Sequence, residues 1–109
     1  MRPYTPRRAN LTRWLQNAPE DVLDCFDAGE KEHDRFTVFL GKRFMMESPR
    51  GHHVSYLHCS TEPRGYSGSG EMLAHKAAAF RYRSGHHRVK WDSLPENVRA
   101  FVTRWINEP

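Results

Sequence analysis

The strongest structural pattern in the chain lies at its C-terminal end. Ser93 and Glu96 have the spacing of a capping box, and Pro95 falls in the first turn of the helix that this box would begin. Apolar residues then recur at intervals of three and four, as on one face of an amphipathic helix: Leu94, Val98, Phe101, Val102, Trp105 and Ile106. Because such a helix must bury its apolar face against another element, we expect it to dock on a sheet.

Short runs rich in aromatic and β-branched residues predict that sheet. The predicted strands are 35–40, 43–47, 54–59, 80–83 and 88–91. The first two are joined at Gly41 and predict a hairpin, and a turn at 48–51 precedes the third. The last two alternate in polarity and predict a second hairpin. The fold class expected is therefore α+β, a small antiparallel sheet packed by the C-terminal helix.

The first quarter of the chain is less regular. Residues 1–10 contain three arginines and two prolines and predict a flexible basic arm, which leaves 11–109 as a single domain. The spacing of Leu11, Trp14 and Leu15 predicts a short N-terminal helix. Residues after Pro19 fit either a second short helix through Phe26 or a strand over 22–26. Farther along, the Ala-rich run 71–80 predicts a helix.

Composition narrows the class of protein. The chain is 38% apolar and 12% aromatic, which predicts a folded domain with an aromatic core. Two cysteines, Cys25 and Cys59, are too few for a disulfide framework, and we expect Cys59 to be a buried structural residue. No apolar run approaches the length of a membrane span, and no signal peptide is recognisable. We therefore expect a cytoplasmic protein that does not associate with membranes.

The basic residues have a pattern of their own. The formal net charge is +4, and 13 of the 17 basic residues are arginine, whose planar fork of donors suits phosphate. If 80–83 and 88–91 pair as strands, four cations gather on one face of the sheet: Arg81, Arg83, Arg88 and Lys90. This face would bind nucleic acid, unless nearby acids neutralise it and it is only a solvated outer face.

The segment 60–71 combines three closely spaced glycines with Arg64 and Tyr66. Such a loop either makes an awkward turn or approaches a ligand, and the sequence leaves both readings open. It lacks the glycine spacing of nucleotide-triphosphate and dinucleotide loops. Arg64 and Tyr66 are nevertheless candidate binding residues, because arginine and tyrosine supply much of the binding energy at interfaces.

The seven histidines invite a search for chemistry. Their spacing is poor for a metal site, and no cofactor motif occurs, so we expect neither a metal nor a cofactor. Glu71 and His75 lie four residues apart on the predicted helix, but neither a nucleophile nor a third orienting group accompanies them. Cys59 adjoins His58, but neighbouring residues of a strand face opposite sides. The sequence therefore names no catalytic residue and leaves enzymatic activity undecided.

Four segments resemble a family of small uncharacterised proteins encoded by bacteriophages and other mobile elements. They are Cys25-Phe-Asp-Ala-Gly29, Asp34-Arg-Phe-Thr-Val38, Tyr56-Leu with Ser60, Pro63 and Gly65 to Gly70-Glu71, and Trp91-Asp-Ser-Leu-Pro-Glu-Asn-Val98. The resemblance spans about residues 22–106 and departs from the pattern at the arginine-rich start and at 72–80. It implies a bacterial host cell and a small protein that acts by binding host machinery.

Three function hypotheses follow. The leading one is a non-enzymatic accessory protein that binds nucleic acid or a host nucleoprotein complex, a class that includes inhibitors of CRISPR effectors. The second is an enzyme acting on a nucleic-acid or nucleotide phosphate through His58, His75 and Glu71. The third is a structural protein that associates with itself through its aromatic surface. The oligomeric state is not predicted.

Overall fold

A computed structural model describes residues 13–41, 44–63, 65, 68–82 and 85–108, with Arg81 described by its backbone only. The predicted basic arm at 1–10 lies outside these ranges. The described elements are, in chain order, β1 (Val22–Asp27), β2 (Phe36–Leu40), β3 (Met46–Ser48), β4 (Gly51–Cys59), β5 (Gly68–Leu73), α2 (Ala74–Ala79), the 3-10 turn η2 (Phe80–Tyr82), β6 (His87–Arg88), the 3-10 turn η3 (Trp91–Ser93) and α3 (Glu96–Asn107).

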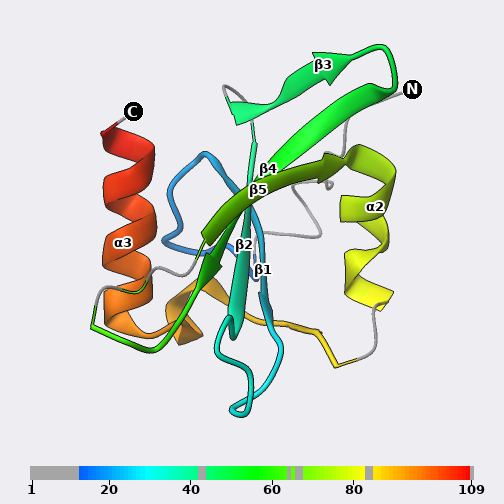
Figure 1. The fold of residues 1–109 in the computed structure, drawn as a ribbon. Helices are drawn as coiled ribbons and strands as arrows, with labels where there is room; N and C mark the ends of the chain where they lie inside the picture. The colour runs from blue at the N-terminus through cyan, green and yellow to red at the C-terminus, as the bar shows by residue number, and fades with distance from the viewer. Residues whose placement is uncertain (1–12, 42–43, 64, 66–67, 83–84, 109) are drawn as a thin grey trace.

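The six described strands form one antiparallel sheet. The long strand β4 organises it, because β4 pairs with β2, β3 and β5. The order continues from β2 to β1 and then to the two-residue strand β6 at the edge. Figure 1 shows the sheet between two helices, with α3 and α2 on opposite sides.

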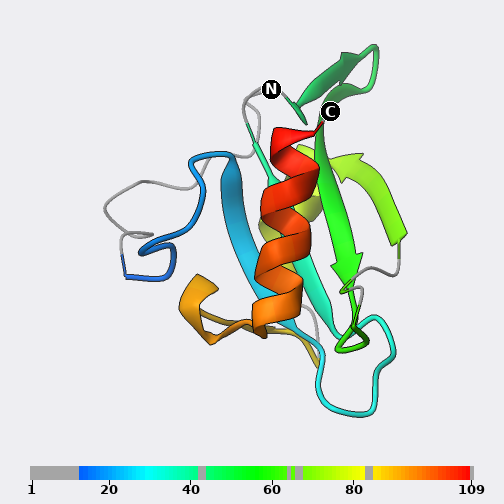
Figure 2. The same ribbon diagram turned by 90° about the vertical axis from the view of Figure 1, so that its left-hand side faces the viewer.

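Each face of the sheet has its own core. On the α3 side, which Figure 2 brings to the front, the helix residues Val98, Val102 and Ile106 pack against the strand residues Cys25, Val38, Leu40, Leu57 and Cys59. On the α2 side the core is aromatic, as expected from the composition: the Phe80 ring centroid lies 4.9 Å from that of Phe26 and 5.2 Å from that of Phe39. Two apolar faces explain why β2 is buried along its whole length.

The α+β class predicted from the sequence is confirmed. The short helical segment near the N-terminus appears, in its described part, as turns over 13–17, closed by the Ala18 N–H donating to the Leu15 carbonyl. Of the two readings for 22–26, the strand is correct and the helix is wrong. Phe26 must reach the aromatic core while Cys25 faces the other core, and a strand alternates its side chains in this way.

The first predicted hairpin joined the wrong strands. β2 pairs with β1 on one side and with β4 on the other, while β3 pairs with β4. A strand buried on both faces belongs in the middle of a sheet, so β2 needs two long partners that the three-residue β3 cannot supply. The predicted turn at 48–51 is correct, since Ser48 pairs with Gly51 across it.

The second predicted hairpin is wrong. Residues Phe80–Tyr82 form a 3-10 turn that continues α2, and only His87–Arg88 forms a strand, which pairs with β1. The alternation that resembled a strand has a different cause: the end of α2 delivers the Phe80 ring to the aromatic core and leaves Tyr82 outside it. The helix predicted at 71–80 is also shorter than expected, because residues through Leu73 belong to β5.

The C-terminal helix is confirmed, but its capping box is not formed. Ser93 lies in η3, where its hydroxyl donates to the Lys90 carbonyl, and Pro95 occupies the N-cap position. Helix α3 has 12 residues and is the longest helix in the described part of the chain. None of the helices described here has the length and apolar character needed to cross a membrane.

Candidate functional site

The basic sheet face predicted from the sequence does not form as a paired hairpin. Arg88 is turned toward β1, where its Nη2 atom donates to Asp24 Oδ2 at 2.7 Å. Its guanidinium carbon also lies 5.8 Å from the centre of the Trp14 ring. Lys90 is exposed. The side chain of Arg81 and the whole of Arg83, Arg64 and Tyr66 lie outside the described residues.

The aromatic residue between Arg81 and Arg83 has an unexpected position. In a strand over 80–83, Tyr82 would lie on the face opposite Arg81 and Arg83, but it lies in the 3-10 turn η2 and is 78% exposed. Its place in η2, one turn beyond α2, explains the exposure, since Phe80 occupies the core position of this turn. The chain therefore presents a tyrosine ring at the surface with an arginine on either side of it in the sequence.

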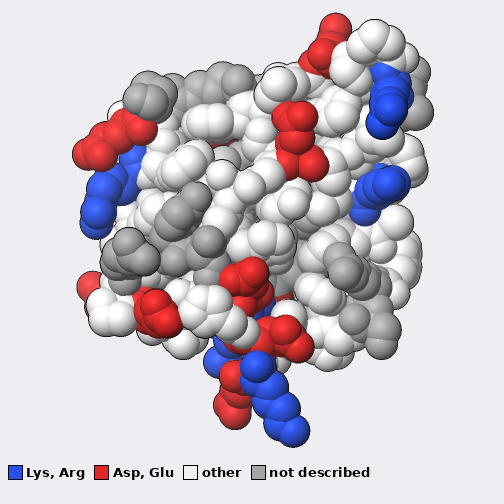
Figure 3. Space-filling model, in the orientation of Figure 1, with Lys and Arg blue, Asp and Glu red and all other residues white. Residues whose placement is uncertain are grey.

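Acidic residues accompany the basic residues of the described ranges, since all 13 Asp and Glu residues of the chain lie within these ranges. Figure 3 shows one face on which Lys and Arg lie apart from one another with Asp and Glu among them.

Two of the three glycines of segment 60–71, Gly65 and Gly70, are explained by contacts within the protein itself, whereas a Cβ atom on Gly68 would meet nothing within 4 Å. Gly65 has φ +71°, and a Cβ atom built on it would lie 2.7 Å from the Asn97 carbonyl oxygen in the first turn of α3. A Cβ on Gly70 would lie 2.6 Å from the Tyr56 hydroxyl oxygen. The Asn97 side-chain amide also donates to the Glu62 carbonyl. The segment is therefore anchored between α3 and β4, and Gly65 and Gly70 permit that close packing.

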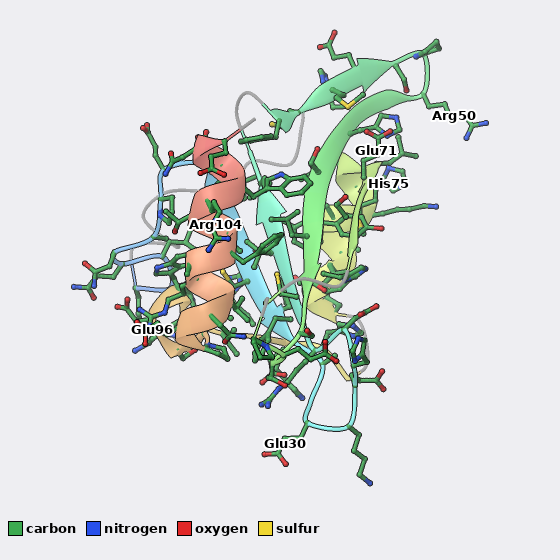
Figure 4. The ribbon with its side chains drawn as sticks, turned by 60° about the vertical axis from the view of Figure 1, so that its left-hand side comes forward. Glu30, Arg50, Glu71, His75, Glu96 and Arg104 are labelled. Carbon is green, nitrogen blue, oxygen red and sulfur yellow. The ribbon has the colours of Figure 1, made fainter. Side chains whose placement is uncertain are left out.

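The candidate pairs named from the sequence do not form as predicted. His58 Nδ1 lies 3.2 Å from Thr37 Oγ1, and its ring packs against Tyr56. Glu71 is in β5 and His75 is in α2, so the two do not share a helix (Figure 4). Among the described residues, no group of three or more His, Cys, Asp or Glu side chains is arranged to hold a metal ion.

Both cysteines are buried in the core on the α3 side. Burial raises the pKa of the Cys59 thiol to about 12, and burial, reinforced by the neighbouring Asp24, raises the pKa of the Cys25 thiol well above its ordinary value. Because the thiolate is the reactive form, neither cysteine has the character of a nucleophile. The burial expected for Cys59 is confirmed.

A polar cluster that the sequence did not reveal crosses β3, β4 and β5. Ser48 Oγ lies 2.8 Å from His53 Nε2, and the other ring nitrogen of His53, Nδ1, lies 3.8 Å from Glu71 Oε1. Ser48 is the last residue of β3, at the turn in which Arg50 projects outward in Figure 4. We call Ser48, His53 and Glu71 the hairpin cluster. They come together because Met46 pairs with His53 and Ser55 pairs with Glu71.

The hairpin cluster lines a shallow groove of about 340 Å³. Its walls are formed by the turn between β3 and β4 and by β5: Met46, Glu47, Ser48, Pro49, Arg50, His53 and Glu71. A second, broader groove of about 670 Å³ separates α3 from the segment before β1, where Glu96, Arg99 and Arg104 give it mixed charge. The first groove is the one in which a hydroxyl, an imidazole and a carboxylate converge.

Comparison with protein-family models, with curated proteins and with solved structures finds no match to this chain.

Proposed function

We propose that this chain is a small accessory protein of a phage or mobile element that binds nucleic acid or a host nucleoprotein complex in the bacterial cytoplasm. Inhibition of a CRISPR effector is one activity within this class. The observation that carries the proposal is the 78% exposure of Tyr82, which stands between Arg81 and Arg83 in the sequence. An exposed aromatic ring is the usual platform on which unpaired bases stack, and arginine side chains are the usual partners of their phosphates.

The arginine content of the chain supports the same proposal. The formal net charge is +4, and 13 of the 17 basic residues are arginine. Arginine is suited to contact phosphate groups because its planar fork of donors can form two parallel hydrogen bonds with phosphate oxygens.

Arg88 has a different role in this proposal from the one that its sequence neighbourhood suggested. Its guanidinium binds a fully buried carboxylate, so it stabilises the sheet edge near Lys90 rather than contacting phosphate. The proposed contact residues are therefore Arg64, Tyr66, Arg81, Tyr82, Arg83 and Lys90. The resemblance to phage-encoded proteins supports the setting, because small proteins of that kind commonly bind host machinery.

The dependence of binding on salt tests the proposal. A labelled single-stranded oligonucleotide should bind the protein at about 50 mM salt and bind about tenfold more weakly at about 150 mM, since phosphate contacts release counterions. Arg81→Glu with Arg83→Glu should remove most of this binding. Arg104→Glu, an exposed change on α3 across the sheet from α2, is the control and should matter little. Binding that is absent at low salt, or insensitive to the double change, would contradict the proposal.

A further inference from the structure

The hairpin cluster has the connectivity of a serine nucleophile with its base. A hydroxyl contacts one nitrogen of an imidazole, Ser48 Oγ to His53 Nε2 at 2.8 Å, and a carboxylate faces the other nitrogen, Glu71 Oε1 to His53 Nδ1 at 3.8 Å. Serine hydrolases of unrelated folds are recognised by this order of groups and not by position in the sequence. We propose that Ser48, His53 and Glu71 form a hydrolytic site that cleaves carboxylic esters.

The burial of Ser48 and His53 matches their assigned roles, and the Glu71 side chain is 42% exposed. Ser48 is exposed at the hairpin turn, where a substrate can reach it. The His53 side chain is only 19% exposed, and its Nδ1 atom is buried with no hydrogen-bond partner among the described residues. A buried polar atom without a partner is costly unless something compensates it. Glu71 supplies that compensation when its carboxylate moves about 1 Å closer, as such contacts do when a substrate binds.

Ester hydrolysis at this site proceeds in two steps, acylation and then deacylation of Ser48. Ser48 Oγ attacks the carbonyl carbon of the ester while His53 Nε2 takes the hydroxyl proton. His53 then gives that proton to the departing alkoxide, which leaves as the alcohol, and the acyl group stays on Ser48. Water attacks the acyl-serine, again with His53 accepting and returning a proton, and releases the carboxylic acid and free Ser48. Glu71 is a positioning residue that orients the ring and stabilises the imidazolium.

The hairpin turn fixes the position of the Ser48 hydroxyl. The Arg50 backbone N–H donates to Ser48 Oγ at 3.2 Å, and Ser48 Oγ lies 3.4 Å from the Gly51 carbonyl oxygen as well as 2.8 Å from His53 Nε2. Met46, which is 54% exposed, and Pro49 provide apolar contacts in the groove. A groove of about 340 Å³ that is shallow and partly apolar suits a short acyl chain. The substrate class is therefore an ester of a short carboxylic acid.

A fluorophosphonate probe tests the nucleophile directly. The intact protein should gain one adduct, located at Ser48 by mass spectrometry, and should hydrolyse p-nitrophenyl butyrate with saturation. Ser48→Ala should abolish both, and His53→Gln should slow both by about 100-fold or more. Glu71→Gln should lower kcat about tenfold and leave KM nearly unchanged. Because a partly unfolded sample would give the same pattern, the rates are compared per folded molecule.

The same hairpin provides the matched control. His52 Nδ1 lies 3.2 Å from Glu47 Oε1, a His–Glu pair whose ring has no serine against it in the described contacts. His52→Gln should leave labelling and turnover unchanged, and Ser93→Ala should do the same for an exposed serine on η3. Circular dichroism and thermal unfolding confirm that each variant is folded. An absence of adduct on Ser48, or an adduct that forms equally fast in folded His53→Gln, would overturn the proposal.

Discussion

Arg88 Nη2 donates to Asp24 Oδ2 at 2.7 Å, and the Asp24 residue has no exposed surface. The two residues are 64 positions apart in the sequence, and their contact joins the edge strand β6 to β1. The Cys25 backbone N–H donates to the other carboxylate oxygen, so both oxygens of Asp24 are hydrogen-bonded. Arg88, which the sequence suggested as a phosphate contact, therefore stabilises the fold by pairing with a buried carboxylate.

Arg88→Ala should destabilise the protein by about 3–5 kcal/mol, because it leaves a buried carboxylate without its cation. Urea unfolding followed by circular dichroism measures the loss. Arg35→Ala is the matched control: the Arg35–Asp27 pair is more exposed, at 27% and 20%, so water replaces the lost partner and the loss should be smaller. Equal losses in the two variants would contradict the structural role of Arg88.

The pair Arg35–Asp27 should make stability depend on pH. The hydrogen bonds from Arg35 are the main cause that lowers the pKa of Asp27 below its ordinary 3.8, with help from the Gly29 N–H. A lowered pKa in the folded state means that the stabilisation is complete well above pH 3.8 and is lost as the pH falls through the folded-state value. The difference in unfolding free energy between the native protein and Arg35→Gln should therefore shrink on acidification. A difference that stays constant between neutral and acid pH would contradict this.

The two thiols should be unreactive in the folded protein. Cys25 and Cys59 have no exposed surface and raised pKa values, so both accessibility and thiolate content are low. A thiol-reactive dye at pH 8 should label almost none of the native chain and two thiols per chain in denaturant. Rapid labelling of the native protein would show that the core on the α3 side opens readily.

Gly65→Ala should be more damaging than Gly85→Ala. Both glycines have positive φ, +71° and +81°, so each substitution carries the same backbone cost of about 1–2 kcal/mol. Only at Gly65 does the added Cβ meet backbone, 2.7 Å from the Asn97 carbonyl oxygen, whereas nothing lies within 4 Å at Gly85. Thermal unfolding of the two variants isolates that contact, and equal shifts in Tm would mean that the segment does not pack on α3.

The sequence predicted the helix and the turn whose positions depend on local periodicity and turn residues. The face of α3 was readable because Val98, Val102 and Ile106 recur at helical spacing, and the turn at 48–51 was readable from Pro49 and Gly51. The run at Phe80–Tyr82 was misread because alternating Phe, Arg and Tyr fits a strand as well as a 3-10 turn. What decided between them was the packing of Phe80 against Phe26, more than 50 residues away.

The candidate sites depended even more on distant contacts. Asp24 and Arg88 carry no signal of their pairing, since their contact follows from the register of β1 with β6. The hairpin cluster required the registers of β3 and β5 on β4 to bring Ser48, His53 and Glu71 together. The turn predicted at 48–51 brings Ser48 near His53, but the Ala-rich run predicts a helix from Glu71 onward and so gives no sign that Glu71 lies on β5 beside β4.

The exposure of Tyr82 is the point on which the proposed nucleic-acid binding rests, and one comparison tests it most directly. We expect Tyr82→Ala to weaken binding of a single-stranded oligonucleotide by about 1–3 kcal/mol at low salt, as measured by fluorescence anisotropy, because a stacked base loses its platform. Tyr82→Phe keeps the ring and should retain nearly all of the affinity. Equal affinity for the native protein and Tyr82→Ala would contradict the account.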